Sequence, residues 1–301
     1  MGTGSKSALA EDLIEQFCLF LEKSGRSQGT VTNYRYDLEG LVRWTQSRSW
    51  ERFDILHFVA NDLGPYRAFL IGKYKPKTTN RKLATLKVFL SWASRHLGLD
   101  EMPHLPNVKL VPKERVQPSY LSLEEQDRLL KTVAAKGTTL QSAAVLLMLN
   151  TGIRVSELCA LKWKDIRISN EESTLTLYSS KQKLQVKVPL NGVARGALIA
   201  LQQQKKPRTT DAVFTGPSGT MTRSGVLTML NRYAKLANLK NWSSVMLRHT
   251  FCMNLIHANV SPEIISKLMG HRSSEMTLAY YAPPKSDLIT AEELLAVERL
   301  A

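Results

Sequence analysis

The sequence lacks the features of a secreted or membrane-spanning protein. Its three cysteines, Cys18, Cys159 and Cys252, are odd in number and far apart, so they do not suggest a disulfide framework. Residues 1–8 have no apolar signal-peptide core, and the most apolar run, 143–149, is too short to span a bilayer. We therefore expect three buried, reduced thiols in a cytoplasmic protein that does not contact a membrane.

Patterns that bind metal ions are also missing. The chain has no Cys-x-x-Cys pair, and its six histidines are scattered along the sequence. The sequence therefore predicts no metal site, and we expect chemistry that depends on side chains alone.

Acidic residues are scarce compared with basic ones. There are 41 Lys and Arg residues against 26 Asp and Glu residues, which gives a formal charge of +15. Such an excess favours a polyanionic partner, and nucleic acid is the first expectation. An anionic membrane surface and a basic surface without a partner are the alternatives.

Proline is concentrated in one segment of the chain. Pro103, Pro106, Pro112 and Pro118 lie in a stretch with few bulky apolar residues, which is typical of an extended linker. The total of 301 residues also exceeds the usual size of one domain. We therefore predict an N-terminal domain over 1–102, a linker over 103–118 and a second domain over 119–301.

The first domain has a helical pattern. Apolar residues recur at helical spacing at Leu13, Phe17, Phe20 and Leu21, and a later helix is predicted over 78–97. Basic residues gather around that later helix, and we select as DNA-binding candidates Lys77, Arg81, Lys82 and Lys87. The pattern predicts a small helical bundle with a basic face, and the linker after it could let the two domains close around a duplex, although any one of these lysines can equally be an ordinary solvated residue.

The second domain begins with a helix signal and contains one hairpin. Ser122 and Glu125 form a predicted capping box, and Gln141–Asn150 has the pattern of a buried helix. Segments 175–178 and 186–190 are rich in β-branched and apolar residues, which predicts a hairpin with Lys181 at its turn. Helices resume from residue 195, interrupted by a loop near Gly216–Gly219. The fold class is therefore mainly α with a small β-hairpin.

A further capping box at Thr290–Glu293 predicts a short C-terminal helix with an apolar stripe. This helix can pack on its own domain or dock on a neighbouring protomer, and the sequence favours neither.

Five polar residues of the second domain suit chemistry on a phosphodiester. They are Arg154, Lys181, Arg248, His271 and Tyr280. Cations can neutralise the oxygens of a pentacovalent phosphorus while a phenol supplies the nucleophile, which indicates DNA strand transfer. Two alternatives stay open: Arg154 can be a surface partner of Glu157, and Tyr281 can be the nucleophile instead of Tyr280.

The segments around these residues resemble the tyrosine recombinase family, which includes phage-type integrases and Xer-type recombinases. The motifs are Thr-Gly-Ile-Arg ending at Arg154, Leu-Arg-His-Thr-Phe around Arg248, Leu-Met-Gly-His ending at His271, and Tyr280 nine residues later. The resemblance covers nearly the whole chain: the region of Thr30 to Trp44 resembles the family's helical core-binding domain, and 119–301 resembles its catalytic domain.

The resemblance implies a role for each motif residue. Arg154 and Arg248 would grip the non-bridging oxygens of the scissile phosphate, and Lys181 would protonate the departing 5′ oxygen. His271 would hydrogen-bond the phosphate, and Tyr280 would form a 3′-phosphotyrosyl link. No nucleotide or metal is needed, because the protein link retains the energy of the phosphodiester.

One position departs from the family's pattern. A histidine usually lies three residues before the second arginine, and here that residue is Val245. Valine can neither accept the tyrosine proton nor donate to phosphate. His249 is a possible substitute, although a family histidine at that place is commonly structural.

The resemblance therefore implies a site-specific recombinase that acts on double-stranded DNA, with several protomers, expected to be a tetramer, holding two sites. The same site would serve phage integration, resolution of DNA dimers or movement of a mobile element. Sequence preference would depend on side chains near Arg81 or Arg223. A DNA-binding protein that has lost cleavage and a relaxing type IB topoisomerase are the alternative functions.

Overall fold

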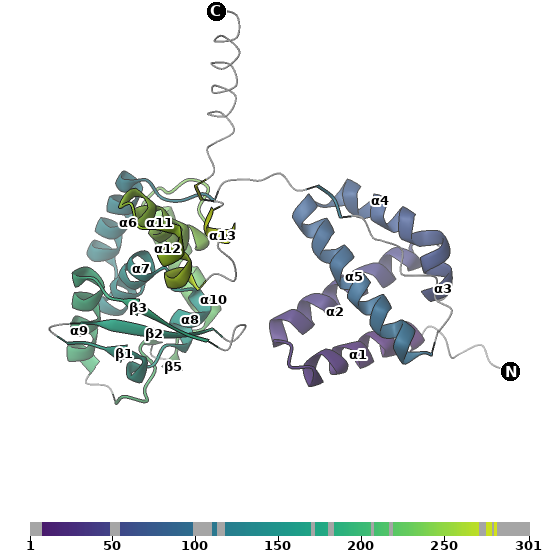
Figure 1. Cartoon of the computed structure of the whole chain (residues 1–301), viewed down its shortest axis with the longest axis horizontal. Coiled ribbons are helices and arrows are strands. Elements are labelled where there is room, and N and C mark those ends of the chain that lie inside the picture. The colour runs from purple at the N-terminus through teal and green to yellow at the C-terminus, as the bar shows by residue number, and fades with distance from the viewer. Residues whose placement is uncertain are drawn as a thin grey trace, which may run out of the picture. The chain divides into compact units, whose positions relative to one another are not determined.

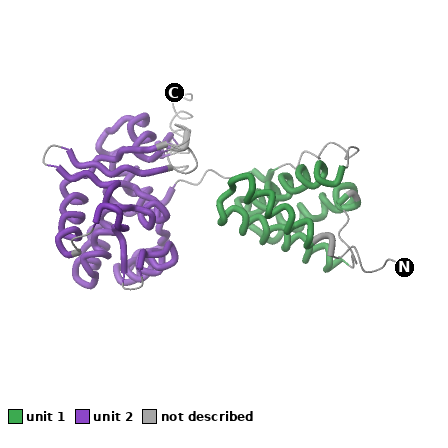
Figure 2. Tube along the Cα trace, turned by 90° about the horizontal axis from the view of Figure 1, so that it is seen from below, with its two compact units in different colours: residues 1–115 green, residues 116–301 purple. Residues whose placement is uncertain are grey.

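The computed structural model of the chain describes residues 8–48, 55–98, 110–112, 118–169, 172–179, 184–205, 208–216, 219–270, 275–278 and 280–281. The chain forms two compact units, residues 1–115 and residues 116–301 (Figure 2). Within the described ranges, none of the helices combines the length and the apolar character needed to cross a lipid bilayer.

The N-terminal unit is helical (Figure 1). Its elements are α1 (Ala8–Lys23), α2 (Gln28–Gln46), α3 (Ile55–His57), the π-helical turn η1 (Phe58–Asp62), α4 (Leu63–Lys73) and α5 (Pro76–His96). Phe17 at the centre of α1 is fully buried and packs edge-on against Phe89 of α5. The predicted stripe is confirmed at Leu13, Phe17 and Leu21, but Phe20 is 41% exposed because it lies at the margin of that stripe.

The C-terminal unit is mostly helical with a small antiparallel sheet, as the sequence predicted. Its helices are α6 (Leu123–Lys136), α7 (Thr139–Thr151), α8 (Val155–Ala160), the 3-10 turn η2 (Trp163–Asp165), α9 (Gly192–Lys205), α10 (Arg223–Leu236), α11 (Val245–His257), α12 (Pro262–Met269) and α13 (Glu275–Leu278). Its strands are β1 (Ile166–Arg167), β2 (Thr174–Ser179), β3 (Leu184–Pro189), β4 (Thr215–Gly216) and β5 (Gly219–Thr220).

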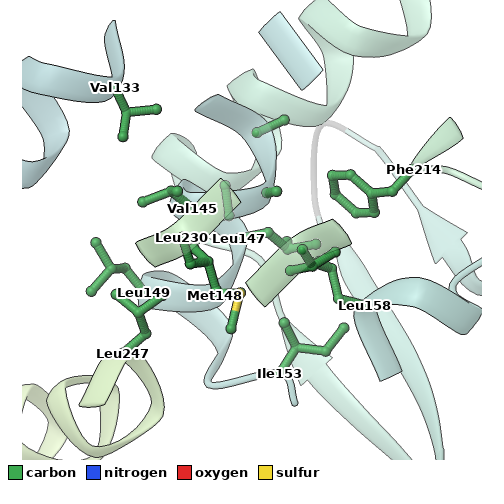
Figure 3. Close-up of a cluster of buried hydrophobic side chains, with 14 of the residues drawn as sticks. Val133, Val145, Leu147, Met148, Leu149, Ile153, Leu158, Phe214, Leu230 and Leu247 are labelled. Carbon is green, nitrogen blue, oxygen red and sulfur yellow. The ribbon is translucent and has the colours of Figure 1, made fainter. Parts of the chain in front are cut away.

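Helix α7 is the buried centre of the C-terminal unit. It begins at a capping box in which Thr138 and Gln141 satisfy each other's backbone amides, and α6 begins at the predicted box of Ser122 and Glu125. The side chains of Val145, Leu147 and Met148 are all buried, and Figure 3 shows them among side chains from neighbouring elements such as Phe214. A helix that is apolar all round needs this environment.

The predicted hairpin is confirmed as β2 and β3, which form a sheet of order β1-β2-β3. Leu175 pairs with Val188 and Leu177 with Val186, and Leu175, Leu177 and Val188 are buried against the core. This register fixes which face of the hairpin points inward. Lys181, in the connection between the strands, lies outside the described residues.

Two expectations about smaller features need correction. Where a loop was expected near Gly216–Gly219, β4 and β5 form a two-residue antiparallel pair, which is too short to produce a strand pattern in the sequence. Cys18 and Cys252 are buried free thiols as predicted, but Cys159 is only partly buried because α8 lies near the surface.

Candidate active site

Arg154 lies at the start of α8, directly after a sharp turn. Helix α7 ends at Gly152, whose φ of 62° is a left-handed conformation that glycine adopts without strain. Arg154 is the N-cap residue of α8, and its guanidinium donates to Glu157 at 2.7 Å. The Arg154 side chain remains 43% exposed, so its charge is accessible to an anion. The surface pair with Glu157 is therefore real, and it leaves Arg154 at the rim of the site.

Arg248 is held much more firmly. It lies in the first turn of α11, where its Nη1 donates to the carbonyl oxygen of Gly152 at 2.6 Å and its Nη2 donates to the carbonyl of Met269. Burial, together with the nearby positive charge of Arg154, lowers the pKa of Arg248 to about 10, so it stays charged at neutral pH. The guanidinium thus joins the end of α7, the start of α11 and the end of α12.

Tyr280 brings its hydroxyl to this same part of the unit. The phenol oxygen lies 2.9 Å from Nδ1 of His249, which is on α11 next to Arg248. Burial raises the pKa of Tyr280 to about 12, while the positive charge of Arg248 acts in the opposite direction. The hydroxyl is therefore protonated at rest and lies within the electrostatic field of Arg248.

Tyr281, the rival nucleophile, points elsewhere. Its hydroxyl donates to the carbonyl oxygen of Val260 at 3.1 Å, and the residue is 40% exposed. This contact explains Tyr281 as a surface residue that fastens its segment to the chain after α11. The geometry thus supports Tyr280 over Tyr281 as the nucleophile.

A shallow pocket connects the two arginines. Arg154, Arg248, Val186 and Gly270 line it, so that α8, α11, the hairpin and the end of α12 meet around one space. Gly270 ends α12 in a left-handed conformation with a φ of 55°. His271, the next residue, lies outside the described residues, as does Lys181. The carboxylate of Glu157 also lines this space, so an anion that reached the two guanidinium groups would have to displace it from Arg154.

Val245 occupies the place of the histidine that the motif usually contains. It is the first residue of α11 and is 53% exposed. Its side chain offers no donor or acceptor. Among the described residues, His249 provides the polar partner of the Tyr280 hydroxyl; the sequence alone presented His249 only as a possible substitute.

The basic candidates of the N-terminal unit separate into exposed and buried residues. Lys77, Arg81 and Lys87 are exposed along α5, whereas Lys82 is only 5% exposed. Lys82 donates to buried Asp37 of α2 at 2.9 Å and lies over the ring of Tyr74. In this structure Lys82 joins two helices and does not offer its charge to solvent.

Asp37 was not selected from the sequence, although it organises this basic face. Besides Lys82, it accepts hydrogen bonds from Arg81 and from the Thr85 hydroxyl. The Arg81 side chain is 43% exposed, so it pairs with Asp37 while part of it remains open to solvent. In the C-terminal unit, Arg223 is exposed at the start of α10.

Family models match both units of the chain. The model described as "Phage integrase family" matches residues 119–286, and "Phage integrase, N-terminal SAM-like domain" matches residues 14–96. Because the first of these models alone covers more than half of the chain, the chain belongs to the phage integrase family.

Individual relatives agree with this assignment. The chain is 26% identical over 287 residues to "Tyrosine recombinase XerC" of Xanthomonas campestris pv. campestris (strain B100), covering 93% of this chain and 86% of the relative. It has the fold of the XerH site-specific recombinase bound to difH substrate, with a TM-score of 0.71 and 18% identity over 93% of this chain and 83% of the other. The lambda integrase tetramer bound to a Holliday junction has a TM-score of 0.68 and 19% identity, covering 88% and 77%.

Proposed function

We propose that this protein is a site-specific tyrosine recombinase that cleaves and rejoins duplex DNA through a 3′-phosphotyrosyl link at Tyr280. The observation that carries the proposal is the placement of the Tyr280 hydroxyl beside α11, in the field of Arg248, in a chain of the phage integrase family. Nucleophile and cation thus belong to one site, as attack on a phosphodiester requires.

The proposed reaction needs no bound nucleotide or metal. The oxygen of Tyr280 bonds to phosphorus, the bond from phosphorus to the 5′ oxygen breaks, and the free 5′ hydroxyl later reverses the step at a paired site. Arg154 and Arg248 neutralise the non-bridging oxygens as charge develops. The proposal assigns protonation of the 5′ oxygen to Lys181 and a phosphate hydrogen bond to His271, both of which lie outside the described residues.

Double-stranded DNA with specific recombination sites is the proposed partner, in the cytoplasm. The net charge of +15 and the exposed residues Lys77, Arg81, Lys87 and Arg223 support a contact with phosphates. The lambda integrase neighbour is a tetramer on a Holliday junction, and we propose a tetramer on paired sites for this chain as well. Residues 290–301, predicted as a C-terminal helix, lie outside the described residues, and docking on a neighbouring protomer is part of this proposal.

One observation favours a second candidate, a DNA-binding protein that has lost cleavage. Val245 gives the start of α11 a solvent-exposed apolar side chain where the family usually has histidine. Such a protein would bind DNA sites but would form no covalent link.

Covalent trapping separates these functions. Bound sequences are first selected from a pool of random duplexes, and the selected duplexes are then nicked next to the cleaved phosphate so that the freed fragment diffuses away. We expect an adduct in denaturing gels, located on Tyr280 by mass spectrometry. Tyr280→Phe should abolish the adduct, because the nucleophilic oxygen is missing, while Tyr281→Phe, the matched control, should retain it.

Selected binding without an adduct from the unchanged protein would reject cleavage and favour the second candidate. A related active recombinase on its own nicked site provides the positive control. An adduct on Tyr281 would overturn the assignment of the nucleophile.

A further inference from the structure

We propose that His249 is a catalytic residue that accepts the proton of Tyr280 as the tyrosine attacks DNA. This inference rests on the proposed strand-transfer function and names a group that the reaction otherwise lacks, because Val245 cannot take a proton. In this chain the histidine that serves the nucleophile is therefore four residues further along α11 than in the family's usual pattern.

His249 is in direct contact with the hydroxyl of Tyr280. Nδ1 of His249 lies 2.9 Å from the Tyr280 oxygen, which is within the range for transfer of a proton between the two groups. The two rings lie with their centroids 5.5 Å apart and are tilted by 39°. In the tautomer that carries its hydrogen on Nε2, His249 accepts the Tyr280 hydrogen bond at Nδ1, so the proton can pass without movement of either ring.

His249 also shares a face of α11 with the position where the family usually has histidine. Val245 and His249 are four residues apart on α11, so they lie on the same face of the helix, one turn from each other. Side chains on a helix lean toward its N-terminus, so a residue covers the turn before its own Cα. His249 therefore lies on the face of α11 that carries position 245, one turn further along the helix.

The surroundings of His249 favour its neutral form. Burial and the adjacent charge of Arg248 both lower the pKa of His249 below its ordinary value, so the ring is neutral at neutral pH and Nδ1 can accept a proton. In the described part of the chain, the other titratable group that acts on Tyr280 is Cys252, whose pKa burial raises to about 11, while Arg154 and Glu157 act on the neighbouring Arg248. Within the described residues, His249 is the neutral base that faces the phenol.

The proton balance of the step is complete. The Tyr280 oxygen becomes acidic as it bonds to phosphorus, and its proton passes to Nδ1. The bond to the 5′ oxygen breaks, and that oxygen takes a proton from the acid that the proposed function assigns to Lys181. When the 5′ hydroxyl attacks the phosphotyrosine, its proton passes back to Lys181, the bond from phosphorus to the Tyr280 oxygen breaks, and the proton on His249 returns to that phenol oxygen.

The test measures single-turnover cleavage of nicked duplexes that carry either a 5′ oxygen or a 5′ sulfur leaving group at the selected site. Sulfur leaves without protonation, so this substrate removes the need for an acid but not for a base. We expect His249→Ala to slow cleavage about 10²-fold with both substrates, as for loss of a general base. Lys181→Ala, by contrast, should recover on the sulfur substrate.

His249→Asn distinguishes proton transfer from simple positioning. Its amide oxygen can accept the Tyr280 hydrogen bond but cannot take the proton at neutral pH. We expect Asn to be as slow as Ala, and the rise in rate through the acidic range, where the wild-type imidazole loses its proton, to disappear. His257→Ala, at the far end of α11, is the matched control and should cleave at the parent rate.

Cleavage by His249→Asn at the parent rate, or recovery of either His249 variant on the sulfur substrate, would overturn the proposal. DNA binding and thermal unfolding of each variant show that the protein is folded, and Asn gives the answer if Ala disturbs the fold. Absence of an adduct from the unchanged protein would instead reject the recombinase function itself, so the two failures are distinguishable.

Discussion

Two chemically identical side chains have different environments in this site. Arg248 is buried and fixed by two backbone carbonyls, whereas Arg154 is half-exposed and pairs with Glu157. A fixed charge in a water-poor site stabilises developing charge strongly because it does not need to reorganise. Arg154, in contrast, can exchange its carboxylate partner for a phosphate as DNA arrives.

Gly152 determines whether Arg248 can take this position. A Cβ added there would lie 2.6 Å from the Phe251 ring, and its left-handed backbone is strained for any other residue. We therefore expect Gly152→Ala to lower the free energy of unfolding by at least about 2 kcal/mol and to reduce cleavage, because the carbonyl that holds Arg248 is displaced.

Chemical denaturation measures the stability change. Gly196→Ala is a matched control, because that glycine lies within α9 with nothing within 4 Å of an added Cβ. The control should be neutral or gain about 0.5–1 kcal/mol. Equal stability of the two variants would contradict the role given to Gly152.

Motif residues were predictable from the sequence because their spacing is distinctive, but the partners of several polar residues were not. Lys82 and Lys87 have similar sequence surroundings, yet Lys82 is buried by an interaction with Asp37, which lies 45 residues earlier. The contact of His249 with Tyr280 was equally unpredictable, because the two residues are 31 positions apart in the sequence. Sequence periodicity carries no information about such distant pairs.

At the scale of elements, the sequence predicted long and strongly patterned segments correctly. The capping box at Ser122, the buried α7 and the β2-β3 hairpin all follow local rules. The π-helical turn η1 and the β4-β5 pair were missed, because elements of two to five residues depend on tertiary contacts more than on pattern.

The buried ion network between α2 and α5 leads to a prediction about the N-terminal unit. Asp37 is 3% exposed and Lys82 is 5% exposed, so removing the carboxylate would leave a buried ammonium without its partner. We expect Asp37→Ala to destabilise the unit by about 3–5 kcal/mol. Thermal unfolding followed by circular dichroism measures this effect.

Glu15→Ala provides the comparison, because it removes an exposed partner of Arg35 on the same unit. Such surface pairs contribute little, so this variant should keep the parent melting temperature. If Asp37→Ala also melted like the parent, the network would not hold the two helices together.

At the scale of the whole molecule, the excess of positive charge predicts a steep dependence of DNA affinity on salt. Each phosphate contact should contribute about −0.9 to the log–log slope, and six to ten contacts would weaken binding by about 10³–10⁵-fold between ~50 and ~200 mM salt. Fluorescence anisotropy with a selected duplex measures the slope. Lys87→Gln should reduce its magnitude by about one contact, whereas a flat response would reject phosphate binding as the main source of affinity.

The hydrogen bonds of Arg248 to the backbone also affect which residues would change first in related sequences that lose DNA cleavage. Its guanidinium connects three chain segments. Removing it would leave the Gly152 and Met269 carbonyls without this donor, which would lower the free energy of unfolding by about 1–3 kcal/mol for each group left unsatisfied. A descendant that no longer cut DNA would still lose stability if this arginine were replaced. Decay of the enzyme would therefore become visible first at Arg154 and Tyr280, while Arg248 persisted as part of the architecture.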